Sequence, residues 1–345
     1  MVAMDAAPAL PEDWTSSSPD ASDVADLLDL LRRHERTARG WPSASRAAVE
    51  TDVCGRGAAT RRHLLLRDGS GVARGWATVH DRAAARVVIA VVVDPDLDAA
   101  SADDVAAYLF EWAREQAADL GRERGVELTQ MDSGAFADDP RQQLWLTGRG
   151  FLRMRSWWQM SRPVTPEEGN EDAFPPPGEG VIVRLVAREG DAMPDEEDLR
   201  TVHDILETSF TDHFNSHQES FDEFVARLRE DPGHRWDHWW IAELERDGMT
   251  PLPVGALVGS VSPGTDGEPD GSYVEYLGVL AAARGRGVAR SLLHAVIADA
   301  ARRGRDRVGL EVDADSPTGA TALYEAVGFA TKYVTQSWHR DLPVA

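Results

Sequence analysis

Apolar residues recur along this chain with two different spacings. Short, mostly apolar runs such as residues 85–95 and 253–261 are typical of buried strands. Residues 288–301 instead place apolar side chains three and four positions apart, which predicts an amphipathic helix that ends near Arg302-Arg303-Gly304. Because strands and helices alternate along the chain, the pattern predicts an α/β layer structure.

The same order of elements is predicted twice. The first half gives a helix, three strands, a helix, a strand and a short apolar segment before a last strand, at 23–37, 63–68, 73–81, 85–95, 103–118, 126–132 and 142–151. The second half repeats this order at 197–208, 239–244, 253–261, 272–280, 288–301, 307–312 and 320–329. The chain therefore looks like two copies of one plan.

Residues 163–180 separate the two copies. This stretch is rich in Pro, Gly and carboxylates and poor in core-forming residues, which predicts an exposed linker. The sequence thus predicts an N-terminal domain at 1–162 and a C-terminal domain at 181–345, a division that suits a chain of 345 residues.

The composition limits the classes of partner that this protein is expected to bind. A formal net charge of −23 argues against nucleic acid, because phosphate binding requires basic patches, and it suits a cationic small molecule. No apolar run approaches the ~20 residues of a membrane span, and residues 1–14 lack the pattern of a signal peptide. Cys54 is the only cysteine, which excludes an intrachain disulfide. We expect a cytoplasmic protein, monomeric or homodimeric, that binds neither membrane nor nucleic acid.

The segment Arg284-Gly285-Arg286-Gly287 joins a predicted strand to the helix at 288–301. No side chain there can cap the helix, so backbone N–H groups and the positive end of the helix dipole face outward. The glycines let the main chain approach an anion closely, and the arginines add charge. A dinucleotide fingerprint would need a third glycine where Arg290 stands, and a Walker loop would need Gly-Lys-Ser/Thr. The pattern therefore predicts a phosphate site; a simple tight turn is the alternative.

The corresponding stretch of the first half differs in chemistry. It has no glycine and carries carboxylates that would repel a phosphate, at Asp94, Asp96, Asp98 and Asp103. Ser101 is expected to cap the following helix, with Asp104 in the capping-box position. The sequence thus predicts one anion site per chain, in the C-terminal half.

Two motifs carry a resemblance to a known family. Arg284-x-x-Gly287-x-Ala289 after YLGV (276–279), followed by DADSPTGATALYEAVGF (313–329), resembles the GNAT superfamily of acyl-CoA-dependent N-acetyltransferases. Over 181–340 the resemblance rests on both motifs; over 20–162 it rests on element order and on the ending LWLTGRGF (144–151). A tandem pair with one degenerate copy resembles the group that includes mycothiol synthase. The implied fold is two tandem GNAT-like domains, each a central mixed β-sheet flanked by helices.

The resemblance also implies a binding site for acetyl-CoA as co-substrate, without a metal. Backbone N–H groups of the loop would hold the pyrophosphate, from residues Arg284, Gly285, Arg286, Gly287, Val288 and Ala289. The main chain of Leu277, Gly278 and Val279 would run beside the pantetheine arm, and the Val279 N–H would polarise the thioester carbonyl. Ser316 stands where the family usually has Asn, and Tyr324 where it has a tyrosine near the sulfur.

Acetyl transfer to an amine needs a base, a donor to the developing oxyanion and an acid for the leaving thiolate. Tyr324 is the candidate acid; the alternative is a packing role in the core. Glu275 and Tyr273 are expected to face the side of their strand opposite Tyr276, with Glu275 as candidate base. The alternative for Glu275 is to bind a cationic acceptor without catalysis, and Glu311 is a second candidate base.

The residues favour an enzyme that moves an acetyl group from acetyl-CoA directly to an amine of a small molecule. One alternative is a non-catalytic acyl-CoA-binding or regulatory protein; a more specific version of the first reading is a mycothiol-synthase-like acetyltransferase. Asp212, His213 and His217 have near-helical spacing, but no further ligand with suitable spacing follows them. We therefore expect them to line the acceptor pocket rather than hold a metal.

Overall fold

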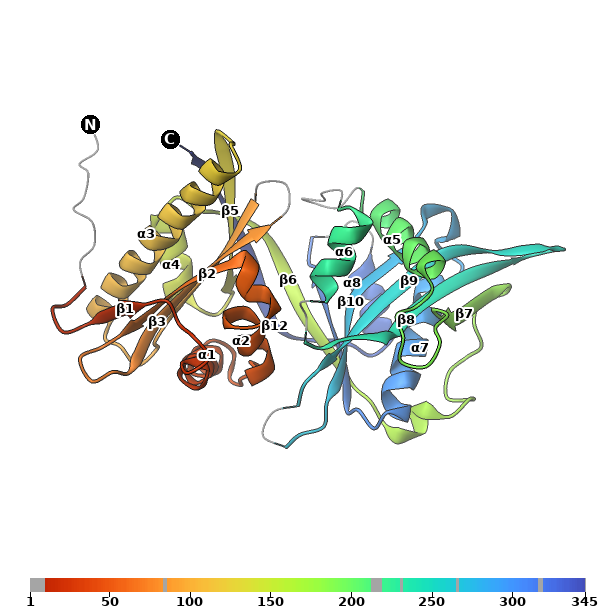
Figure 1. The fold of residues 1–345 in the computed structure, drawn as a ribbon. Coiled ribbons are helices and arrows are strands. Elements are labelled where there is room, and N and C mark those ends of the chain that lie inside the picture. The colour runs from red at the N-terminus through yellow and green to blue at the C-terminus, as the bar shows by residue number, and fades with distance from the viewer. Residues whose placement is uncertain are drawn as a thin grey trace. The chain divides into compact units, whose positions relative to one another are not determined.

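The computed structural model describes residues 10–82, 86–211, 219–229, 232–264, 267–315 and 319–344. The chain divides into two compact units (Figure 1). The N-terminal unit comprises Met1–Trp157 together with Tyr333–Ala345, and the C-terminal unit comprises Trp158–Lys332.

The N-terminal unit is built on a mixed sheet with the strand order β1-β2-β3-β4-β5-β12. Neighbouring strands are antiparallel except for β4 and β5, which are parallel. The strands are β1 (Thr15–Ser17), β2 (Arg61–Arg67), β3 (Ala73–Arg82), β4 (Arg86–Val93), β5 (Leu128–Phe136) and β12 (Ala330–Pro343).

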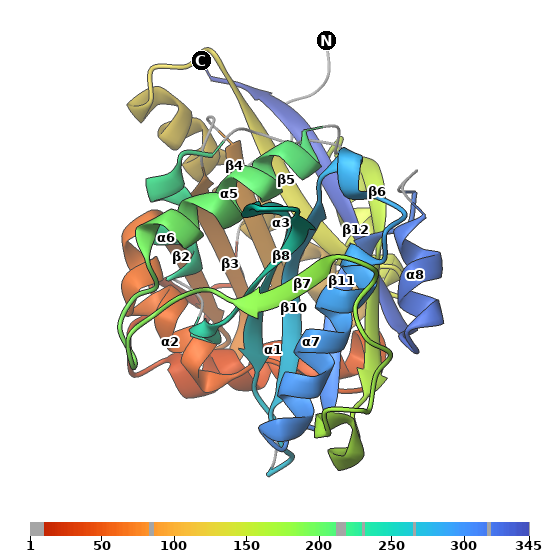
Figure 2. The same ribbon diagram turned by 90° about the vertical axis from the view of Figure 1, so that its right-hand side faces the viewer.

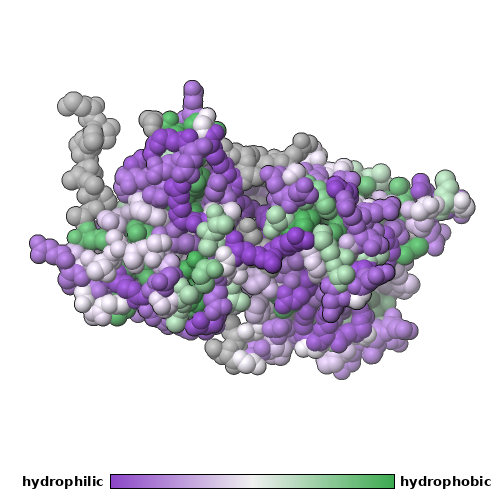
Figure 3. Space-filling view, in the orientation of Figure 1, coloured by the Kyte–Doolittle hydropathy of each residue, from purple (hydrophilic) through white to green (hydrophobic). Residues whose placement is uncertain are grey.

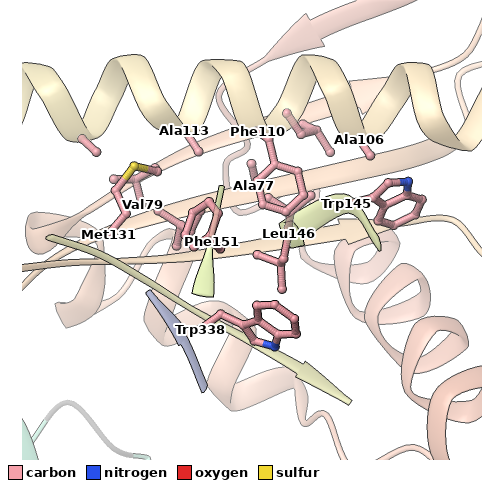
Figure 4. Close-up of a cluster of buried hydrophobic side chains, with 14 of the residues drawn as sticks. Ala77, Val79, Ala106, Phe110, Ala113, Met131, Trp145, Leu146, Phe151 and Trp338 are labelled. Carbon is pink, nitrogen blue, oxygen red and sulfur yellow. The ribbon is translucent and has the colours of Figure 1, made fainter. Parts of the chain in front are cut away.

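Helices cover both faces of this sheet. The helices are α1 (Val24–Arg39), α2 (Arg46–Val53), α3 (Ala99–Glu123) and α4 (Pro140–Gly148), with a short 3₁₀ helix at Arg56–Thr60. Helix α3 presents Ala106, Phe110 and Ala113 to the core on one face (Figure 4). Leu27 and Leu30 of α1 pack on the other face against Trp76 of β3.

The cap of α3 differs from the prediction. The helix begins at Ala99, four residues before the predicted start at 103, and its N-cap is Asp98, whose side chain accepts hydrogen bonds from the backbone N–H groups of Ala100 and Ser101. The prediction that Ser101 caps this helix is therefore wrong. Its hydroxyl lies within the first turn and donates to Asp98 at 2.7 Å, because a carboxylate is available one turn earlier.

The C-terminal unit repeats this architecture with the strand order β6-β11-β10-β9-β8-β7. The pairs β7/β8, β8/β9 and β9/β10 are antiparallel, whereas β10 and β11 are parallel. The strands are β6 (Leu152–Pro163), β7 (Val181–Leu185), β8 (His234–Arg246), β9 (Met249–Ser262), β10 (Gly271–Val279) and β11 (Arg307–Asp313).

Two separate cores flank this second sheet. Helices α5 (Glu196–Phe210) and α6 (Phe221–Leu228) pack on one face, around Trp239 and Phe224. Helices α7 (Val288–Arg302) and α8 (Ala320–Ala326) belong to the other core, in which Leu292 and Leu293 are fully buried. Figure 1 shows α5 and α6 above the strands and α7 below them, and Figure 2 shows α7 beside β10 and β11. The predicted fold class, two tandem mixed sheets flanked by helices, is confirmed.

The last strand of each copy completes the sheet of the other copy. Strand β6 follows α4, yet its residues from Trp158 onward belong to the C-terminal unit. Strand β12 follows α8, yet it pairs with β5 from Thr335↔Phe136 to Pro343↔Leu128 and buries Trp338 in the N-terminal core (Figure 4). The units are thus divided differently from the predicted domains, because residues 333–345 form part of the N-terminal unit.

The predicted linker is mostly exposed but is anchored to α7. Val164 is buried, and the ring of Phe174 stacks on His294 of α7 with ring centroids 4.5 Å apart. Between them, the 3₁₀ helix Pro166–Gly169 packs against the end of α7 near Arg302. In Figure 2 this yellow-green segment follows α7.

Hydrophilic residues cover most of the face drawn in Figure 3, as expected for a chain with a net charge of −23. Small groups of hydrophobic residues lie among them. Within the described ranges, no helix has the length and apolar character needed to cross a membrane.

The exchanged strands can be tested through Trp338, which is 7% exposed. Trp338→Ala removes a large side chain from the N-terminal core and should cost roughly 3–5 kcal/mol. Hydrogen exchange measured by mass spectrometry should therefore show faster exchange in β4, β5 and α3, with β9 and β10 unchanged. Asp341→Ala, an exposed position of the same strand, is the control and should leave exchange unaltered. Faster exchange in β9 and β10 alone would contradict the exchange of strands.

Candidate active site

Strands β10 and β11 are paired over a short distance only. Their register runs from Ser272↔Val308 through Tyr273↔Gly309 to Val274↔Leu310, and among the described residues no pair follows. Strand β10 continues to Val279 alongside β9. The two parallel strands therefore part beyond Val274.

The second half of β10 directs backbone groups toward this parting. The N–H of Leu280, directly after the strand, donates to the carbonyl of Val254 at 2.9 Å. Hydrogen-bonded pairs alternate along an antiparallel ladder, so Gly278 is bonded to β9 while Leu277 and Val279 turn their N–H and C=O groups the other way. Both predicted residues thus present backbone polar groups on the β11 side.

Gly278 is required by a close contact. A Cβ at this position would lie 2.9 Å from Leu206 Cδ2 and 3.1 Å from Ser209 Oγ, both on α5. Any side chain here would push α5 away from β10. The glycine therefore lets α5 approach the strand next to the parting.

A β-bulge changes the predicted directions of the side chains on β10. The register with β9 shifts between Val274 and Tyr276, so Glu275 is an extra residue in the strand. Val274 packs in the core under α7, whereas Tyr276 packs in the core under α5 and α6. Because the bulge breaks the alternation, Tyr273 and Glu275 lie on the same face as Tyr276, and the prediction that they face the opposite side is wrong.

Two carboxylates flank the point where the strands part. Glu275 accepts a hydrogen bond of 2.6 Å from the hydroxyl of Ser260 on β9. Glu311 follows Leu310, the last residue of β11 that is paired with β10. The Glu311 carboxylate accepts a hydrogen bond from the side-chain amide of Gln159. The Glu311 side chain keeps contact with solvent, yet desolvation by the surrounding protein raises its pKa, opposed by the Gln159 hydrogen bond.

The loop after β10 has the geometry that the sequence predicts. Gly285 and Gly287 have φ values of 77° and 80°, a region that favours glycine. Gly287 is the N-cap of α7 and makes no side-chain cap, so the first N–H groups of the helix stay uncapped by any side chain. Arg284 and Arg286 are exposed, and within the described part of the chain neither forms an ion pair. Val288 is buried under the loop and fixes the start of the helix.

The linker contacts this loop, which the sequence analysis missed. A Cβ on Gly178 would come within 2.3 Å of the Arg286 carbonyl oxygen, so only glycine fits there. The Cα of Gly178 also lies 4.0 Å from the position that a Cβ on Gly287 would take. A glycine such as Gly178 in the segment PPPGEG (175–180) can indicate a close approach of two backbones. The sequence does not indicate which segment it contacts.

Tyr324 lies on α8 in the core under α7. It is 8% exposed, and its ring meets Phe329 edge-on at 6.0 Å. Burial raises the pKa of its phenol to about 12, so the hydroxyl keeps its proton at neutral pH. Leu277 and Val279 pack against the same cluster, and Ala289 is half-buried at the start of α7.

A polar network on the other face of β10 was also missed. Arg227 of α6 donates to the hydroxyl of Tyr276 at 2.8 Å and makes two hydrogen bonds to Glu219, at 2.9 and 2.7 Å. Burial, together with the nearby charge of Glu275, raises the pKa of Tyr276, and Arg227 opposes this. The arginine thus joins α6 to the strand that carries Glu275.

The N-terminal unit keeps the strand geometry but has no glycine-arginine loop before its helix α3. Its parallel strands β4 and β5 also part, after Ile89↔Ser133. Asp94, directly after β4, is fully buried between Arg33 and Arg74. Burial disfavours the charge of Asp94, but hydrogen bonds from both arginines outweigh it and hold the pKa of Asp94 below its usual value. Asp98 occupies the N-terminus of α3, where α7 has only glycine.

Some predicted positions lie outside the described residues. These are Ser316, predicted to contact the cofactor, and the trio Asp212, His213 and His217. Within the described ranges, no group of three or more His, Cys, Asp or Glu side chains is arranged to hold a metal ion.

Part of this chain matches a known protein family. Residues 199–329 match the model of the acetyltransferase (GNAT) family. A mycothiol acetyltransferase of Stackebrandtia nassauensis is 24% identical over 327 residues, which cover 94% of this chain and 97% of that protein.

Two solved structures share the fold over nearly the whole chain. A GCN5-related N-acetyltransferase from Sphaerobacter thermophilus superposes with a TM-score of 0.76 at 22% identity, covering 97% of this chain and 98% of that one. A tandem GNAT protein from the clavulanic acid biosynthesis pathway gives a TM-score of 0.70 at 16% identity, covering 96% and 99%. Residues 199–329 therefore form a domain of the acetyltransferase (GNAT) family, in a chain with the fold of tandem GNAT proteins.

Proposed function

We propose that the C-terminal unit binds acetyl-CoA and transfers its acetyl group directly to an amine of a small molecule. The observation that carries this proposal is the loop from Arg284 to Gly287, which ends at the uncapped N-terminus of α7 directly after the strands part. A helix N-terminus preceded by Arg284 and Arg286, neither of which forms an ion pair with any described residue, suits a pyrophosphate.

The backbone of β10 supports the same ligand. The pantetheine arm of coenzyme A contains amide groups, and Leu277 and Val279 offer N–H and C=O groups on the side where β11 has parted. The loop residues 284–289 would then hold the phosphates through their N–H groups. The ligand would extend along β10 as an added strand does along a sheet edge.

The residues around the parting can meet the three chemical demands of acetyl transfer. The amine nitrogen forms a bond to the thioester carbonyl carbon, and the carbon–sulfur bond then breaks. Glu275 takes the proton that the amine loses, directly or through water, and the Val279 N–H donates to the developing oxyanion. The phenol of Tyr324, which is protonated at neutral pH, gives its proton to the leaving thiolate.

The carboxylates near the parting favour an acceptor that carries positive charge. Glu275 and Glu311 lie on the same face of the sheet, and the chain as a whole has a net charge of −23. The similarity to a mycothiol acetyltransferase supports a small-molecule acceptor. The acceptor would approach from the face covered by α5 and α6, while the thioester lies along β10.

Gly287→Glu tests the cofactor site. The change places a side chain and a negative charge at the N-terminus of α7, so calorimetric titration should show no binding of acetyl-CoA. Arg286→Ala removes one solvated charge and should weaken binding about tenfold, by the scale of a charge-assisted hydrogen bond.

Gly304→Glu is the matched control for this test. Gly304 has a φ of 69° and open space around it, and it is exposed at the opposite end of α7. The variant therefore carries the same charge and a similar backbone strain away from the loop, and it should bind acetyl-CoA normally. Normal binding by Gly287→Glu would place the ligand elsewhere.

The catalytic claim is tested by incubating the protein with acetyl-CoA and a panel of small primary amines or a cell extract. We expect release of free coenzyme A and an acetylated amine identified by mass spectrometry. Tyr324→Phe should lower turnover about 10²–10⁴-fold, the usual contribution of general acid catalysis, with acetyl-CoA affinity unchanged. Tight binding of acetyl-CoA without any acetylated product would instead support a non-catalytic acyl-CoA-binding protein.

A further inference from the structure

Ser260 is a buried polar residue in an apolar strand. It is 3% exposed and follows the run Ala256-Leu257-Val258-Gly259 of β9. A buried hydroxyl is costly unless it is hydrogen-bonded. The partner of Ser260 is the carboxylate of Glu275, which its hydroxyl reaches at 2.6 Å.

The register of the sheet explains how these two residues meet. Ser260 is paired with Tyr273, and Glu275 lies two residues further along β10, where the bulge interrupts the alternation. Residues two apart on a strand share a face, so Glu275 lies on the face of Tyr273 and Ser260, and the bulge that follows brings Tyr276 onto the same face. One donor from the neighbouring strand thus holds the carboxylate at the edge of the parting.

We propose that Ser260 is a positioning residue that holds Glu275 in its ionised form, ready to accept the proton of the acceptor amine. This inference rests on the proposed function, in which Glu275 is the base. The hydroxyl donates its single proton to one of the two carboxylate oxygens of Glu275. A hydrogen bond to the charged form of a carboxyl favours that form.

Other titratable and charged groups also surround the Glu275 carboxylate. The charge of Glu275 contributes to raising the pKa of Tyr276 on the same strand, and Arg227 of α6 donates a hydrogen bond to the Tyr276 hydroxyl. Glu311 of β11 lies on the same face of the sheet. His234 of β8 is paired with Ser260, and burial lowers its pKa to about 4, so it is neutral near pH 7. Ser260 donates directly to the carboxylate.

The experiment is a pH titration of the Glu275 carboxyl by ¹³C NMR, in the full chain labelled with ¹³C at the glutamate carboxyls. Glu275→Gln assigns the resonance. In Ser260→Ala the titration midpoint of Glu275 should rise by about one to two pH units, the shift expected for losing one hydrogen bond to a charged group. Ser260→Thr keeps the hydroxyl and should restore the midpoint.

Ser272→Ala is the matched control. Ser272 is 1% exposed on β10, and its hydroxyl accepts from Arg305 at 2.7 Å. Its loss should disturb the sheet to a similar degree without moving the Glu275 midpoint. An unchanged midpoint in Ser260→Ala, or an equal shift in Ser272→Ala, would overturn the positioning role.

The titration does not depend on the acceptor, so its failure can be told apart from failure of the proposed function. If Glu275→Gln retains full turnover in the amine assay, Glu275 is not the base and Ser260 has no catalytic carboxylate to position. If Glu275→Gln is inactive, Ser260→Ala should also shift the acid limb of the pH–rate profile to higher pH, in step with the NMR midpoint.

Discussion

The parting of β10 from β11 after three paired positions is the constraint on which the candidate site depends. A parallel strand beside β10 would satisfy the backbone groups of Leu277 and Val279. Once β11 turns away, those groups need another partner, and an extended ligand with amide groups can provide one. The bulge at Glu275 lies at this point, and Glu275 and Tyr276 both face α5 and α6 there. Four residues separate Val279 from the loop that begins at Arg284, so a ligand along β10 would lead toward the helix N-terminus.

In the N-terminal unit, parted strands are followed by a helix whose N-terminus is already capped. Strands β4 and β5 also part, but the helix that follows has its first N–H groups bonded to Asp98. Asp94 brings a second carboxylate, neutralised by Arg33 and Arg74. A buried charge is costly unless it is paired, so removing either arginine would leave an uncompensated carboxylate. At the N-terminus of α3 the chain thus supplies its own carboxylates, whereas at the N-terminus of α7 it exposes glycines and arginines. The same fold supports packing in one unit and, by our proposal, chemistry in the other.

Sequence periodicity predicted most of the fold, because each amphipathic helix and each apolar strand carries its own signal. It predicted α7 and its uncapped N-terminus, which depend on neighbouring residues only. It did not predict that β12 joins the other sheet, since the apolar pattern around Trp338 suits either one. The face of Glu275 was predicted wrongly because regular alternation assumes a strand without a bulge. The contacts of Gly178 and Ser260 link segments distant in sequence, and a single sequence holds no signal for such pairs.

The central claim is that the loop before α7 makes one acetyl-CoA site per chain. Isothermal titration calorimetry of the full chain with acetyl-CoA measures this directly, because the number of sites is obtained independently of any acceptor. The account predicts a stoichiometry of one, since the N-terminus of α7 is free of side-chain caps and that of α3 is bonded to Asp98. Two sites would mean that the N-terminal unit also binds the cofactor, and no binding would contradict the account altogether.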